Sequence, residues 1–137
     1  METKIPFIIA IDFDGTIKSG HFRDMDAEPV KGAIEGIREL VEMGCKLILW
    51  TCRSGEHVTS AIEYLKRYDV FKYFSKVNEE YMDYSVIGFD TDSPKIFADR
   101  YFDDLASGWA GWGYAISEVT YLVENVYFGP YSSVNPQ

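Results

Sequence analysis

The sequence predicts an α/β fold in which a mainly parallel sheet carries helices on both faces. Short apolar runs alternate along the chain with longer segments whose apolar residues recur at helical spacing, which indicates strands and helices in turn. The apolar runs are continuous, as is typical of strands that are buried on both faces. With 137 residues, 47% of them hydrophobic, the chain has the length for one domain with one sizeable core.

The first predicted strand covers about residues 7–13. Five apolar residues run without interruption from Phe7 to Ile11, and the carboxylates of Asp12 and Asp14 follow directly. These carboxylates therefore lie at the carboxyl end of the strand, where open α/β sheets place their ligands. Because a buried strand that ends in two carboxylates is costly unless they are compensated, we expect a metal ion or a fixed cation beside them.

A loop over residues 14–29 leads into the first predicted helix, over about 30–43. Pro29 opens this helix, in a position that proline tolerates, and Gly44 is placed to cap its carboxyl end. The remaining elements follow in order: a strand at 47–51, a loop at 52–55, a second helix, a short strand at 76–78, an irregular segment at 79–94, a strand at 96–102, a Gly/Trp loop at 107–113 and a final helix.

Nothing in the sequence predicts a second domain, a membrane span or an exported protein. We find no linker or repeat, so the prediction is a single domain over residues 1–137, with 1–5 and about 127–137 as extended or flexible ends. Pro6 and the acidic residues after it interrupt any signal-peptide pattern, and no apolar run approaches membrane-spanning length. The two cysteines form no disulfide framework, so we expect a cytoplasmic protein.

Polar side chains follow three of the predicted strands at the point where each strand ends. Since the carboxyl ends of parallel strands meet along one edge of a sheet, residues that are far apart in the chain converge there. The set consists of Asp12, Asp14, Thr51, Asp103 and Asp104, with Lys95 just before the last of these strands.

These residue types suit phosphoryl transfer. A carboxylate such as Asp12 can attack phosphorus and form an aspartyl phosphate, and a second one such as Asp14 can protonate the leaving oxygen and later activate water. Asp12 with Asp103 or Asp104 offers the oxygen ligands that Mg²⁺ prefers. The hydroxyl of Thr51 and the ammonium group of Lys95 would hold the remaining phosphoryl oxygens.

Three nearby residues have more than one interpretation. Arg53, two positions after Thr51, either helps to bind the substrate or lies on the surface. Lys76 is an alternative to Lys95 as the phosphate-binding lysine. Asn78 follows a short predicted strand, and it either lines the rim of the site or caps a loop.

Together these residues resemble the four motifs of the haloacid dehalogenase-like (HAD) phosphohydrolases, in order along about residues 5–105. The matching positions are the Asp-x-Asp-Gly-Thr segment at 12–16, Thr51, Lys95 and the Asp103-Asp104 pair. The resemblance implies a three-layer Rossmann-like core and a Mg²⁺-dependent phosphatase. Asp12 would be the nucleophile and Asp14 the general acid/base, with the backbone carbonyl of Asp14 also on the metal. The implied metal ligands are Asp12, Asp14, Asp103 and Asp104, with Thr51 and Lys95 on the phosphate; which of the last two aspartates contacts the ion is left open.

Many members of this family carry a cap domain over the site, and this chain has no room for one. Only residues 17–29 separate the first strand from its helix, and the segment at 79–94 is too short for a folded domain. The chain therefore resembles small capless phosphatases. An open site admits a small or a bulky phosphorylated substrate, or borrows a cap from another subunit.

Two other functions stay open on the same residues. The chain is alternatively a non-catalytic Mg²⁺/phosphate-binding or interaction module that kept the fold. A phosphotransferase is a further alternative, although no cap domain would exclude water from its reaction.

The charge and the aromatic residues bear on partners. A net charge of −9, from 22 acidic and 13 basic residues, disfavours nucleic acid and anionic membranes as partners. Aromatic residues of the C-terminal region are expected to pack internally or, alternatively, to form a contact in a homo-oligomer. They are Trp109, Trp112, Tyr114, Tyr121, Tyr127, Phe128 and Tyr131.

Overall fold

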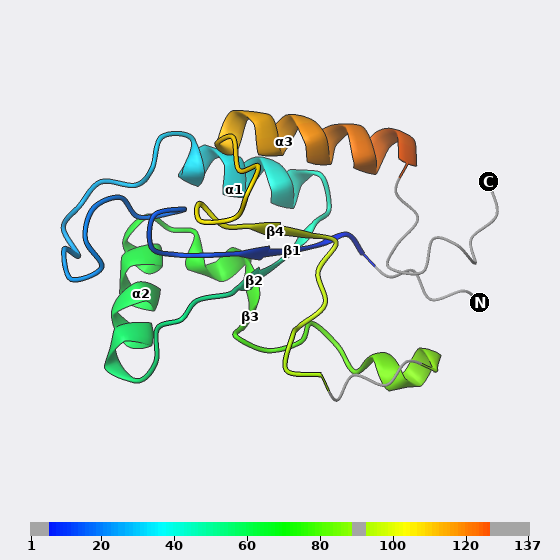
Figure 1. Cartoon of the computed structure of the whole chain (residues 1–137), viewed down its shortest axis with the longest axis horizontal. Coiled ribbons are helices and arrows are strands. Elements are labelled where there is room, and N and C mark those ends of the chain that lie inside the picture. Colours follow the sequence, from blue (N-terminus) through cyan, green and yellow to red (C-terminus); the bar gives the residue numbers. More distant parts are fainter. Residues whose placement is uncertain (1–5, 89–92, 127–137) are drawn as a thin grey trace.

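A parallel sheet lies at the centre of the fold, and the helices pack against it (Figure 1). The computed structural model describes residues 6–88 and 93–126. In this part of the chain the sheet has four strands in the order β3-β2-β1-β4, and each neighbouring pair is parallel. The strands are β1 (Ile8–Ile11), β2 (Lys46–Leu49), β3 (Phe74–Val77) and β4 (Arg100–Phe102). The predicted α/β class with a parallel sheet is confirmed.

The strands end level with one another. Ile11, the last residue of β1, pairs with Leu49 of β2 and with Phe102 of β4. Leu49 in turn pairs with Val77 at the end of β3. The residues that follow these strands therefore meet along one edge of the sheet, as the sequence predicted.

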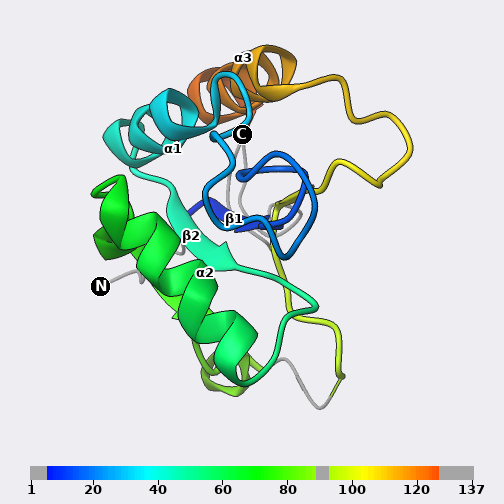
Figure 2. The same cartoon turned by 90° about the vertical axis from the view of Figure 1, so that its left-hand side faces the viewer.

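The α-helices of the described residues all pack against one face of the sheet. They are α1 (Ala33–Glu42), α2 (Glu56–Arg67) and α3 (Trp112–Tyr121). Buried side chains from all three join one cluster with the β1 residues Ile9 and Ile11. The helices α1 and α3 lie side by side in both views (Figures 1 and 2). This face holds the larger hydrophobic core.

The opposite face has a smaller core, and its cover differs from the prediction. Ile8, Ala10 and Ile48 form this core with Tyr84 and Ile96. No α-helix of the described residues covers it, and only the 3-10 helix η2 (Tyr84–Ile87) of this part of the chain adds a buried side chain, that of Tyr84, to this core. The reason is topological: α1 and α2 connect strands that step in the same direction along the sheet, and right-handed connections then place both on one face. The cover comes instead from the connection between β3 and β4.

The first helix begins later than the sequence predicted. The backbone N–H of Val30 donates to the carbonyl of Ile17 at 2.7 Å, and Pro29 forms an isolated bridge with Lys18. Gly32 then takes a φ of 85° directly before the helix. Pro29 thus belongs to a β-like contact and does not open the helix. At the other end Gly44 has a φ of 89°, as its predicted capping role requires.

Other boundaries shift by a few residues. The strand predicted at 96–102 is β4 only over its last three residues, although Asp99 N–H still donates to the Ile8 carbonyl at 2.7 Å. Short helices complete the described chain: η1 (Phe71–Tyr73), η2 (Tyr84–Ile87) and the π-helix η3 (Leu122–Val126). The ends predicted at 1–5 and about 127–137 lie outside the described residues. Within 6–88 and 93–126, no helix has the length and apolarity to cross a membrane.

Candidate active site

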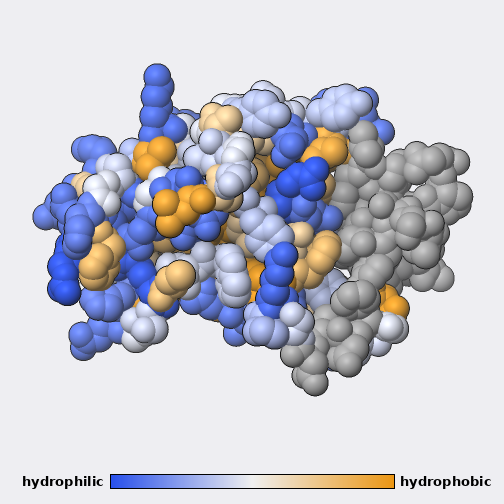
Figure 3. Space-filling view, in the orientation of Figure 1, coloured by the Kyte–Doolittle hydropathy of each residue, from blue (hydrophilic) through white to orange (hydrophobic). Residues whose placement is uncertain are grey.

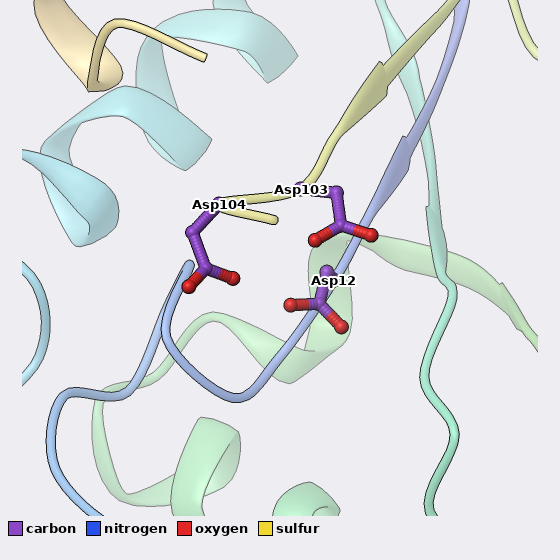
Figure 4. A group of neighbouring side chains, drawn as sticks. All are labelled: Asp12, Asp103 and Asp104. Atoms are coloured by element: carbon purple, nitrogen blue, oxygen red, sulfur yellow. The ribbon is translucent and has the colours of Figure 1, made fainter. Parts of the chain in front are cut away.

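Three carboxylates meet at the carboxyl ends of β1 and β4. Asp12, Asp103 and Asp104 each offer an oxygen, and these oxygens lie within 4.8 Å of one another. Figure 4 shows the three side chains pointing toward a common space. The Asp12 N–H donates to the Phe102 carbonyl at 2.8 Å, so the pairing of β1 with β4 continues one residue beyond the strand and fixes this approach. Residues that are far apart in the sequence are thus brought together, as expected.

A buried threonine links two of these carboxylates. Thr16 Oγ1 lies 3.0 Å from Asp12 Oδ2 and 3.0 Å from Asp104 Oδ1. The same hydroxyl accepts the Asp104 N–H at 2.8 Å. A hydroxyl carries one proton, so Thr16 donates to either Asp12 or Asp104 at any one time. The other carboxylate then receives no hydrogen bond from Thr16. In the sequence, Thr16 stands out only as the last residue of the Asp-x-Asp-Gly-Thr segment. Its position directly after Gly15 is the feature that could have indicated its contact with the carboxylates.

Within residues 6–88 and 93–126, no lysine or arginine forms an ion pair with the three clustered carboxylates. Burial and, after it, the nearby charges of Asp103 and Asp104 raise the pKa of Asp12 to about 7, although hydrogen bonds from Thr16 and the Phe13 backbone oppose the shift. A cation among the three oxygens would remove this repulsion. Mg²⁺ prefers a few carboxylate oxygens together with water and phosphate oxygens, so the three carboxylates fit that ion.

Asp14 is not one of the three clustered carboxylates and pairs with Arg53. Arg53 Nε donates to Asp14 Oδ2 at 2.7 Å and Nη2 donates to Asp14 Oδ1 at 2.8 Å, which is a bidentate ion pair. Within the described residues no backbone hydrogen bond ends on the Asp14 carbonyl, so that oxygen remains available as the expected metal ligand. Of the two interpretations of Arg53, the surface position is wrong, because the residue is buried, and its guanidinium contacts Asp14.

Thr51 is held at the end of β2 by two polar contacts. Its N–H donates to Asn78 Oδ1 at 2.8 Å, and its Oγ1 accepts the Arg53 N–H at 3.1 Å. The hydroxyl therefore keeps its own proton for another acceptor. Asn78 has a φ of 55°, and its N–H donates to the Leu49 carbonyl at 2.8 Å. Of the two roles open for Asn78, capping is the one observed, because it caps the backbone of Thr51.

The structure does not bring Lys95 into contact with the carboxylates. Its side chain is exposed, and its Nζ lies 5.0 Å from the ring centroid of Tyr101, two residues before Asp103. No ion pair in the described part of the chain joins Lys95 to the cluster. Lys76, the alternative, pairs with Glu79 at 3.3 Å. The phosphate-binding lysine therefore stays a prediction.

A lysine that the sequence analysis missed is fully buried beside the site. Lys18 Nζ donates to the carbonyls of Ser19, His21 and Asp24, at 2.9, 2.7 and 2.9 Å. Burial lowers the pKa of this lysine. Since lysines are almost always exposed, no feature of the sequence indicated this position. Lys18 ties together the segment 18–29, which we call the anchored loop.

Side chains of α2 fasten the anchored loop from the other side. Tyr64 Oη donates to the Ala27 carbonyl at 2.8 Å, and Arg67 Nη1 donates to the Met25 carbonyl at 3.0 Å. The anchored loop thus has fixed partners on both sides, and its Phe22 carbonyl accepts from Arg53, the partner of Asp14.

The C-terminal aromatic residues divide into two groups. Trp109 and Trp112 pack against Phe102, with ring centroids 5.5 and 5.3 Å apart. Tyr114 and Tyr121 are 62% and 60% exposed, which leaves an oligomer contact open as a prediction. Tyr127, Phe128 and Tyr131 lie outside the described residues. On the face shown in Figure 3, apolar side chains are scattered among hydrophilic ones.

Comparison with known proteins gives one informative match. No family model and no curated protein matches the chain. A solved structure of a conserved protein from Bacteroides thetaiotaomicron is 31% identical, with a TM-score of 0.70. The match covers 85% of this chain and 91% of the Bacteroides chain. At this identity and coverage, the chain belongs to the same family as that conserved protein.

Proposed function

We propose that this protein is a Mg²⁺-dependent phosphatase of the HAD type, without a cap domain, which hydrolyses a phosphomonoester through an aspartyl phosphate on Asp12. The observation that carries the proposal is the convergence of Asp12, Asp103 and Asp104 at one sheet edge. The raised pKa of Asp12 supports it, because the cluster needs a cation to keep its nucleophile ionised near neutral pH. Thr51 follows the neighbouring strand with a hydroxyl proton to donate.

The proposed reaction has two steps. In the first, an Asp12 oxygen attacks phosphorus, the bond from phosphorus to the leaving oxygen breaks, and Asp14 gives that oxygen a proton. In the second, Asp14 takes a proton from water, whose oxygen attacks the phosphorus of the aspartyl phosphate. The bond to Asp12 then breaks, which releases inorganic phosphate and restores the Asp12 carboxylate and the protonated Asp14.

Binding of the phosphoryl group falls to donors around Asp12. The Thr51 hydroxyl would donate to one phosphoryl oxygen, and Lys95 would supply a positive charge to another. Asp12, Asp103, Asp104 and the Asp14 carbonyl would hold Mg²⁺. When bound, the ion neutralises negative charge on the carboxylates and on the phosphoryl oxygens.

The test is turnover with and without Mg²⁺ on a panel of phosphometabolites and a generic aryl phosphate. We expect the wild type to turn over with Mg²⁺, and Asp12→Asn to lose at least about a thousandfold in kcat. Acid-labile phosphate should be trapped on the wild-type chain and not on this variant. Wild-type rates in Asp12→Asn would contradict the mechanism.

The second candidate, a non-catalytic Mg²⁺/phosphate-binding or interaction module, has one specific observation in its favour. Each oxygen of Asp14 accepts a hydrogen bond from Arg53, and Lys95 lies apart from the cluster. Such a module would bind Mg²⁺ and phosphate saturably in calorimetry and turn over no member of the panel. Transfer to an acceptor other than water remains a further alternative, which product analysis with added alcohols distinguishes.

A further inference from the structure

The ion pair of Arg53 with Asp14 has a buried side and an exposed side. The Arg53 side chain is 4% exposed and the Asp14 side chain 28%. Arg53 therefore holds the carboxylate from the interior, and the opposite side of the carboxylate faces solvent. This is the arrangement expected where a carboxylate must be fixed and still be reachable by a substrate.

Arg53 is itself fixed by contacts that do not involve Asp14. Its Nη1 donates to the His57 carbonyl at 3.1 Å, and its Nη2 donates to the Phe22 carbonyl. The guanidinium carbon lies 5.1 and 5.6 Å from the ring centroids of Phe13 and Phe22. Helix α2, the anchored loop and the segment after β1 thus all orient the guanidinium, which makes it a rigid support.

The hydrogen bonds of Arg53 leave little capacity for a substrate phosphate. Arginine has five N–H groups. Two donate to Asp14, one to Phe22 and one to His57, so four are engaged. Each Asp14 oxygen uses one acceptor site on Arg53 and keeps another for a partner on its exposed side. The geometry thus favours Asp14, and not the substrate, as the ligand of Arg53.

We propose that Arg53 is the positioning residue for Asp14: it fixes the plane of the carboxyl group so that the exposed sites on its oxygens, which carry the proton in the first step and accept one in the second, face the leaving oxygen and the attacking water. This inference rests on the proposed function, because only there does Asp14 exchange protons with a reacting oxygen. A general acid/base must lie within hydrogen-bond reach of its partner, and displacement by about 1 Å can lower the rate about 100-fold.

A double-mutant cycle on kcat tests this role. The variants are Arg53→Met, Asp14→Asn and the pair together, assayed with an aryl phosphate at saturating Mg²⁺ and high protein concentration. We expect Arg53→Met alone to lower kcat on the order of 100-fold with little change in KM. In the Asp14→Asn background the same substitution should change kcat by no more than about twofold, since the residue acts through Asp14.

Arg67→Met is the matched control. Arg67 also donates to a carbonyl of the anchored loop and lies over an aromatic ring, that of Tyr64, 5.3 Å from its centroid. It therefore resembles Arg53 as a structural support but makes no ion pair with Asp14. We expect its kcat to stay within about twofold of wild type.

Folding of each variant is checked by its thermal melting temperature. Arg53→Met leaves Asp14 without its buried partner, whereas the double variant removes both charges together. If Arg53→Met does not fold, Arg53→Lys carries the test, because lysine keeps the charge and loses the bidentate geometry. It should then lower kcat about tenfold, again only when Asp14 is present.

The outcomes separate this inference from the proposed function. Equal losses from the Arg53 substitution with and without Asp14 would overturn the positioning role alone. So would a rise in KM at unchanged kcat, which indicates substrate binding. Wild-type turnover by Asp14→Asn, or no turnover by the wild type, would overturn the proposed function and the positioning role with it.

Discussion

Gly15 lies so close to Asp104 that a Cβ atom at Gly15 would stand 2.4 Å from Asp104 Oδ2. Gly15 also has a φ of 84°, in the region that favours glycine. The turn after β1 therefore depends on the missing side chain twice, for its conformation and for the space that the Asp104 carboxylate fills. The position of one carboxylate of the cluster is set by a residue that has no functional group.

Gly15→Ala is expected to displace Asp104 and to weaken Mg²⁺ binding by at least about tenfold, since the carboxylate cannot keep its place. Gly44→Ala is the matched control, because Gly44 has a similar φ of 89° and nothing within 4 Å of its Cβ position. Both variants lose about 1 kcal/mol of stability from backbone strain. Isothermal titration with Mg²⁺ measures the affinity of each variant. Equal Mg²⁺ affinities would show that the close contact between Gly15 and Asp104 does not affect metal binding.

Thr16→Val should destabilise the protein by about 1–3 kcal/mol, because the Asp104 N–H loses a buried acceptor and two carboxylates lose their shared donor. Thr16→Ser retains the hydroxyl and should recover most of this loss. Urea unfolding of the metal-free variants measures both effects. Equal midpoints for the valine and serine variants would contradict the bridging role of the hydroxyl.

Asp103→Asn should lower the pKa of Asp12 from about 7 toward the ordinary range, since Asp103 is the largest charge contribution to that shift. The variant keeps the size of the side chain and should bind Mg²⁺ at least about tenfold more weakly. Carboxyl NMR titration of the metal-free protein measures the pKa directly. An unchanged Asp12 titration would show that the charge of Asp103 does not contribute to the raised pKa.

The metal-free protein should lose stability as the pH rises from about 4 to about 7. Burial raises the pKa of Asp12 to about 7 and that of Asp99 to about 6, both above the value of 3.8 for an unperturbed aspartate. The folded state therefore holds these protons more tightly than the unfolded state, and its advantage disappears as they dissociate. Mg²⁺ should raise the melting temperature more at pH 8 than at pH 5.

Asp12→Asn isolates the contribution of Asp12 to this pH dependence. The variant removes the group that titrates, so its melting temperature should fall less between pH 5 and pH 8 than that of the wild type. The comparison is made by thermal melting in a chelator at both pH values. Parallel curves for the two proteins would mean that Asp12 does not hold its proton more tightly when folded.

The strands and the residues at their ends were predictable, because continuous apolar runs such as Phe7 to Ile11 have few alternative structures. Parallel strands then dictate that Asp12 and Asp103 meet at one edge, whatever fills the connections. The positions of the helices were not predictable in the same way. They depend on the order of strands in the sheet, which the local pattern of each segment does not contain.

The partners of charged side chains were the least predictable feature. Arg53 and Asp14 are 39 positions apart, and their pairing depends on how the anchored loop packs against α2. Lys18 is buried because carbonyl groups of its own loop turn inward, which composition does not reveal. Lys95 was assigned by its place in a motif, and the side chain lies beside Tyr101.

The burial of Lys18 has a consequence for how ligands enter and leave. Lifting the anchored loop would strip an ammonium group of its three carbonyl acceptors, which is costly in a buried environment. The anchored loop is therefore expected to keep its conformation when a ligand binds or leaves. Ligand binding should therefore show a single kinetic phase, and the existing shape of the site should determine which ligands bind.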